Sequence, residues 1–99
     1  MPWYPKDKFV WDSWFVLEGE KLHAYYLQAD RHACNHDPDA RHNLASVGHA
    51  VKNGNGWYEL GTSFAASHQW DDVAIWTGSV IHSPKLNQYL LFYTARNSR

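Results

Sequence analysis

The sequence contains one cysteine, Cys34, so no disulfide can form within the chain and nothing indicates an oxidising compartment. It also lacks a run of basic residues, and its formal net charge is −1, which gives no electrostatic basis for binding nucleic acid. No apolar segment approaches the length of a membrane span, and residues 1–8 lack the apolar core of a signal peptide. These absences predict a cytoplasmic protein with neither a nucleic-acid nor a membrane partner.

Helical periodicity is missing over any useful length, whereas aromatic residues are abundant, with 6 Trp, 6 Tyr and 4 Phe in 99 residues. A chain of this length forms one small domain at most. We therefore expect a single all-β domain over residues 9–95, preceded by an N-terminal arm (1–8) and followed by a C-terminal tail (96–99).

Runs of aromatic, β-branched and small residues, separated by turn residues, predict six antiparallel strands. The expected strands are 9–17, 22–29, 43–52, 57–60, 74–81 and 88–95, with loops at 30–41 and 61–72. The last two strands repeat the pattern of the first two, with Trp11 and Trp76 about 65 positions apart, somewhat above the usual period of a propeller blade. Because several strands are apolar on both faces, we expect a homo-oligomer, most simply a two-fold dimer.

One carboxylate, Asp12, interrupts the apolar run of the first strand, between Trp11 and Trp14. Burying a carboxylate is costly unless it is hydrogen-bonded or functional. Two interpretations follow from the residues alone. Asp12 either caps backbone N–H groups at a strand end, or it stands on an aromatic floor where a sugar would present hydroxyls to the carboxylate and C–H faces to the indoles.

Two motifs, Val-Trp-Asp-Ser-Trp at 10–14 and Ile-Trp-Thr-Gly-Ser at 75–79, resemble the N-terminal part of the levansucrase and invertase-like glycoside hydrolases. These enzymes are five-bladed β-propellers, as are the related arabinanase-type enzymes. Residues 42–50 and 90–94 resemble the same group, so the resemblance extends over about residues 9–95. It implies a partial propeller, with one four-stranded blade and a following hairpin.

The resemblance also implies roles for individual residues. Asp12 matches the catalytic nucleophile, and Trp11 matches an aromatic residue in the sugar-binding floor. Trp76 and Thr77 match a Trp-Ser pair that holds the sugar and the nucleophile, with Thr in place of Ser. Asp72 lies in a loop that is near the sugar pocket in the related enzymes, although a turn in which it caps backbone groups is the alternative.

The partners of a nucleophile are missing. A retaining glycosidase needs a second carboxylate about 5–5.5 Å from the first as acid/base, and proton donation contributes roughly 10²–10⁴-fold to the rate. Glu18, Glu20 and Glu59 fall at a turn or on a short strand, and Asp37-Pro38 lacks the Arg of the family's Arg-Asp-Pro motif. Two functions stay open: a sucrase- or fructosidase-like fragment with half of a sugar site, and a non-enzymatic interaction, structural or carbohydrate-binding protein.

The segment 32–42 is rich in groups that bind metals, but only His32 and His36 have ligand spacing, so the residues favour a solvated loop, and nothing indicates a cofactor. Cys34 lacks the basic surroundings of a reactive thiolate. His49, on a strand of small residues, is expected to be a hydrogen-bonded interior histidine, and His82 is expected at the surface.

Overall fold

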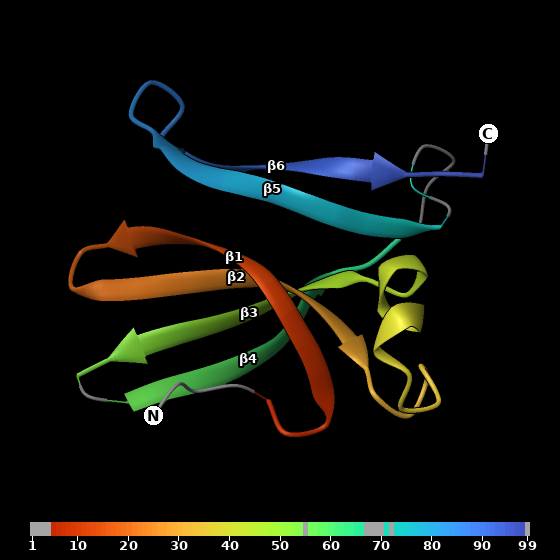
Figure 1. Cartoon of the computed structure of the whole chain (residues 1–99). Helices are drawn as coiled ribbons and strands as arrows, with labels where there is room; N and C mark the ends of the chain where they lie inside the picture. The colour runs from red at the N-terminus through yellow and green to blue at the C-terminus, as the bar shows by residue number, and fades with distance from the viewer. Residues whose placement is uncertain (1–4, 55, 67–70, 72, 99) are drawn as a thin grey trace.

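The structure is a computed structural model that describes residues 5–54, 56–66, 71 and 73–98. The fold is all-β, as the sequence predicts, and it includes a short 3₁₀ helix, η1 (Figure 1). In chain order the elements are β1 (Lys8–Glu18), β2 (Lys21–Asp30), η1 (Pro38–Asn43), β3 (Ser46–Asn53), β4 (Gly56–Phe64), β5 (Ala74–Ser83) and β6 (Gln88–Arg96).

The strands form two antiparallel sheets, one with the order β1-β2-β3-β4 and one consisting of the β5–β6 hairpin. Two boundaries differ from the sequence prediction by three residues or more. β4 extends to Phe64 instead of ending at residue 60, and β3 begins at Ser46 because Asn43 belongs to η1. Small polar residues after position 60 obscure the alternation that would have revealed the longer strand.

The hairpin β5–β6 packs on one face of the four-stranded sheet, with β5 lying mainly against β1 (Figure 1). The buried cluster between the layers contains Trp14 and Leu27 from the sheet and Ile75 and Val80 from the hairpin. Because successive side chains of a strand point to opposite faces, Phe15, Ala24 and Tyr26 lie on the far face of the sheet.

The far face has an apolar cluster of its own, formed by Ala24, Tyr26 and Ala50, with Trp57 packed against it. Gly48 is needed there, because a Cβ at this position would lie 2.2 Å from Cε2 of Tyr26. The four-stranded sheet is therefore apolar on both faces. Neither sheet closes on itself across the described ranges, and no helix in these ranges has the length and apolarity needed to cross a bilayer.

The two sheets carry β-bulges at matching places in the sequence repeat. The pairing of β1 with β2 shifts between Trp11 and Ser13, and that of β5 with β6 shifts between Trp76 and Gly78. The extra residues are Asp12 and Thr77. The repeat is thus present in the backbone as well as in the sequence.

Candidate functional site

A cavity of about 590 Å³ lies beside the two bulges, and residues from β1, β2, η1 and β5 line it. The lining residues are Trp11, Asp12, Leu27, Arg41, His42, Trp76 and Thr77. The structure therefore brings together Trp11, Asp12, Trp76 and Thr77, four of the five residues that the sequence singled out as a sugar site. The fifth, Asp72, lies outside the described residues.

The bulge explains how Trp11 and Asp12 both reach one cavity, since neighbours in a regular strand point to opposite faces. Asp12 has a positive φ of 41°, a conformation that Asp tolerates better than most residues. Its side chain is exposed and it lies in the middle of β1, so the interpretation as a strand-end cap is wrong. A non-glycine residue in such a backbone conformation costs about 1–3 kcal/mol, and residues of this kind cluster at ligand-binding sites.

The 3₁₀ helix η1 supplies two lining residues, Arg41 and His42. Asp37 starts this helix, because its carboxylate accepts a hydrogen bond from the Asp39 N–H at 2.9 Å. The Arg41 guanidinium lies 5.2 Å from the centre of the Trp11 ring and donates from one terminal nitrogen to the Pro38 carbonyl at 2.6 Å. Arg41 is thereby held over an indole at the cavity wall.

His42 connects the two tryptophans of the site. Its ring lies edge-on to Trp11 and to Trp76, with centroid distances of 6.0 Å and 6.5 Å. The Trp76 indole Nε1–H donates to the His42 carbonyl at 2.7 Å, which fixes the orientation of the indole. Sequence reasoning assigned no role at the site to either Arg41 or His42, because their position depends on how η1 packs against β5. The one feature of the sequence that could have pointed to them is that this basic pair lies shortly before the strand of small residues, β3.

The cavity combines a carboxylate, two indoles, a threonine hydroxyl and a guanidinium. These groups suit a polyhydroxylated ligand, whose hydroxyls donate to Asp12 and whose apolar ring face packs on an indole. Among the described residues that line the cavity, Asp12 is the one carboxylate. Glu18 lies in a different cluster, so the described part of the site does not include an acid/base partner for Asp12.

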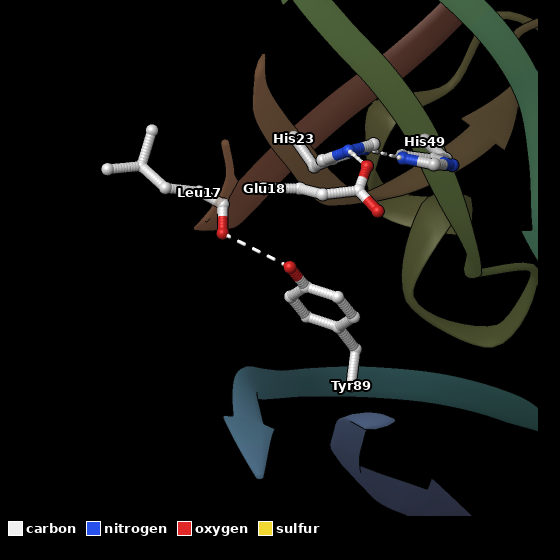
Figure 2. A network of polar contacts seen from close by, with 5 residues as sticks. All are labelled: Leu17, Glu18, His23, His49 and Tyr89. Carbon is white, nitrogen blue, oxygen red and sulfur yellow. Dashed lines mark hydrogen bonds and ion pairs between the residues drawn. The ribbon is translucent and has the colours of Figure 1, made fainter. Parts of the chain in front are cut away.

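A second polar cluster joins the end of β1 to β2 and β3 (Figure 2). His23 Nε2 donates to Glu18 Oε1 at 3.0 Å, and His23 Nδ1 shares a hydrogen bond of 2.8 Å with His49 Nε2. Burial, together with the neighbouring His23, lowers the pKa of His49 below 6.5. His49 is therefore a hydrogen-bonded, half-buried histidine, and its ring stacks on Tyr25 with centroids 4.4 Å apart.

This cluster borders a smaller cavity of about 120 Å³, lined by Val16, Glu18, His23, Tyr25 and Tyr89. The Tyr89 hydroxyl donates to the Leu17 carbonyl at 3.5 Å, so the β5–β6 hairpin contacts the end of β1 here (Figure 2). Burial is the main cause of a raised pKa of Tyr25, with the Glu18 carboxylate adding to it. The arrangement connects the two layers of the fold through polar groups.

The remaining candidates are separate from both cavities. His32 and His36 have rings 6.3 Å apart, and the described residues contain no group of three His, Cys, Asp or Glu side chains able to hold a metal. Cys34 is buried, and burial, followed by the Asp30 carboxylate, raises the pKa of its thiol. His82 is exposed, as expected.

Of the segment 70–72, the structure describes Asp71. This residue is buried, and its carboxylate accepts a hydrogen bond from the Tyr93 hydroxyl at 3.0 Å. Asp71 therefore serves to fix β6 near its end.

A scan against protein-family models matches no family, and neither the curated proteins nor the solved structures give a match to this chain.

Proposed function

We propose that the chain carries the nucleophile-side half of a sugar site and is related to the five-bladed propeller glycoside hydrolases of the levansucrase, invertase and arabinanase type. One observation carries this proposal: Trp11, Asp12, Trp76 and Thr77, from two segments far apart in the sequence, line a single cavity. They are four of the five residues that the family resemblance implies for the sugar site, and the fifth, Asp72, lies outside the described residues. The cavity volume of about 590 Å³ falls within the range of about 300–1,000 Å³ that is usual for small-molecule sites.

In the proposed complex, a sugar ring packs its C–H face on an indole and donates hydroxyls to the Asp12 carboxylate. Hydrogen bonds to an ionised acceptor are about twice as strong as neutral ones, so Asp12 contributes more to the affinity than a neutral group such as the Thr77 hydroxyl. The Thr77 hydroxyl adds a neutral hydrogen bond. Trp76 is held in place for this contact by its bond to the His42 carbonyl.

Binding without efficient turnover is the expected activity. If Asp12 attacked an anomeric carbon, the glycosidic bond would break with its electron pair moving to the leaving oxygen, which needs a proton. The described lining of the cavity offers no carboxylic acid to supply that proton, and general acid catalysis contributes roughly 10²–10⁴-fold. We therefore propose a carbohydrate-binding role, with hydrolysis at most very slow.

Isothermal titration calorimetry with sucrose, fructose and arabinose oligomers tests this proposal. The expected result is saturable binding of at least one of these sugars, without hydrolysis of its glycosidic bonds over the course of the titration. Absence of binding across the whole panel would contradict it.

A second candidate is a non-enzymatic interaction or structural protein built from a propeller segment. It is favoured by the large apolar side chains that the described sheets leave exposed, among them Phe15, Ile81 and Phe92. In this case the cavity would bind no sugar and the apolar faces would carry the function.

A further inference from the structure

On each side of the molecule the described structure leaves large apolar side chains exposed. On the outer face of the β5–β6 hairpin, Ile81 is 53% exposed and Phe92 is 55% exposed. On the far face of the four-stranded sheet, Phe15 is 52% exposed and Leu17 is 65% exposed. We name the first set the hairpin face (Ile81, Leu90, Phe92); Phe15 and Leu17 are the exposed apolar side chains of the far face.

The internal repeat relates each open face to a surface that is already packed within the chain. When the bulge of β1 is aligned with the bulge of β5, Val16 corresponds to Ile81. The strand pairing then makes Tyr25 of β2 correspond to Phe92 of β6. Val16 and Tyr25 pack against the core cluster that contains Val80. The hairpin face is therefore the repeat equivalent of the sheet face that the hairpin covers.

The same superposition places Phe15 at the position of Val80. Val80 is the hairpin residue that is buried against the sheet in the intrachain contact. The far face is thus the equivalent of the hairpin's packed inner face. Within the chain, the inner face of the hairpin packs on the sheet. The repeat therefore predicts that a surface with the backbone pattern of the far face can pack in the same way on the hairpin face.

Side-chain sizes agree with this pairing. Within the chain, the large Trp14 and the smaller Val80 belong to one buried cluster. In the equivalent contact, the small Ser79 takes the position of Trp14, and the large Phe15 takes the position of Val80. A small residue thus lies opposite a large one in both contacts, so two bulky side chains do not collide at this position.

We propose that a second copy of this chain docks head to tail, with the far face of one copy on the hairpin face of the next. Such a contact joins two different surfaces, so it either closes into a ring or continues as an open chain. It differs from the two-fold dimer that the sequence suggests, in which both copies would use the same surface.

The exposed area is large enough for such an interface. A folded monomer of 11.5 kDa is expected to expose about 5,800 Å². This chain exposes 6762 Å² and is only 16 Å thick in its shortest dimension. The surplus of roughly 1,000 Å² compares with the roughly 800 Å² that each partner buries in a standard stable interface.

Light scattering after size-exclusion chromatography, at micromolar concentration, tests the proposal with Phe15→Glu and Phe92→Glu. Each variant alone should run as a monomer, because every head-to-tail contact needs both an intact Phe15 and an intact Phe92. Mixing the two variants should yield a heterodimer of twice the monomer mass, because the intact hairpin face of Phe15→Glu can bind the intact far face of Phe92→Glu. The heterodimer should grow no further, because its two remaining faces both carry a glutamate. Tyr58→Glu, an exposed aromatic outside both faces, should assemble like the unmodified chain.

A monomeric unmodified chain would overturn the proposal and leave the two faces to a different partner. A Phe15→Glu variant that still dimerises while Phe92→Glu does not would indicate a two-fold contact between hairpin faces and would equally overturn it. Circular dichroism establishes folding before these measurements. Should either glutamate variant fail to fold, Leu17→Lys and Ile81→Lys provide a second pair on the same faces, with the same expected masses.

Discussion

Asp12 and Thr77 are the extra residues of two β-bulges, one in each sheet, and both line the same cavity. A bulge re-aims the side chain of its extra residue, and bulges are frequent next to binding sites. The sequence repeat thus produces a pair of equivalent positions that meet at one place, although the two residues differ in chemistry. A carboxylate and a hydroxyl are complementary ways of holding sugar hydroxyls.

The Thr77 hydroxyl is expected to contribute to sugar affinity. Thr77→Val removes the hydroxyl at nearly constant volume and should weaken binding by about 1 kcal/mol, or roughly fivefold, the usual size of a neutral hydrogen bond. Thr77→Ser keeps the hydroxyl and should bind within about twofold of the unmodified chain. Calorimetric titration of both variants with the same sugar measures the difference. Equal weakening by the two substitutions would rule out a role for the hydroxyl.

Trp76 is expected to link the hairpin to η1 through its hydrogen bond to the His42 carbonyl. Trp76→Phe removes the donor and should lower the free energy of unfolding by about 1 kcal/mol, beyond any loss of packing. In a domain of this size that corresponds to a decrease of about 4–8 °C in Tm. Thermal unfolding measures it, with the exposed Tyr58→Phe as a control that should leave Tm unchanged.

The stability of the chain is expected to fall as the medium is acidified through pH 6.5. Burial lowers the pKa of His49 in the folded state, so the unfolded chain binds more protons in this range and the free energy of unfolding decreases. The loss begins near pH 6.5 and continues down to the folded pKa. Urea unfolding at pH 7.5 and at pH 5 measures this decrease in the free energy of unfolding. The decrease should be smaller in His49→Gln than in the unmodified chain. A His82→Gln control, at an exposed position, should keep the full effect.

Gly78 is expected to be essential for the bulge of β5. A Cβ at this position would lie 1.8 Å from the Phe92 carbonyl oxygen, which is a backbone atom with little freedom to move. Gly78→Ala should therefore destabilise the chain by about 3 kcal/mol, at the upper end of overpacking effects. Gly54→Ala, in open space at a positive φ of 67°, should cost about 1–2 kcal/mol. Urea unfolding that gave equal losses for the two variants would contradict this assignment.

The all-β class and the existence of six strands could be predicted, because aromatic and β-branched runs between turn residues are strong local signals. The extent of β4 could not, since residues 61–64 lack alternation. The 3₁₀ helix η1 could not be predicted either, because the residues alone indicate a loop and the short capped turn depends on the Asp37 contact to the Asp39 N–H.

The candidate site was predictable in part. The motifs around Asp12 and Thr77 contain four of the residues that line the cavity. Arg41 and His42 were missed, since they reach the cavity through the packing of η1 beside β5. The positive φ of Asp12 has no local signal in the sequence. Whether a residue in the middle of a strand is bulged depends on the pairing with β2.

The most direct test of the proposed sugar site compares Asp12→Asn with Glu20→Gln by calorimetric titration with the sugar that binds best. Both changes remove one negative charge, but Asp12 lines the cavity, whereas Glu20 is exposed in the turn between β1 and β2. Loss of a hydrogen bond to a charged group is worth about 1.5–3 kcal/mol, so Asp12→Asn should weaken binding by about 10- to 150-fold. Glu20→Gln should leave the affinity unchanged, and an unchanged affinity in Asp12→Asn would contradict the assignment of this cavity as the sugar site.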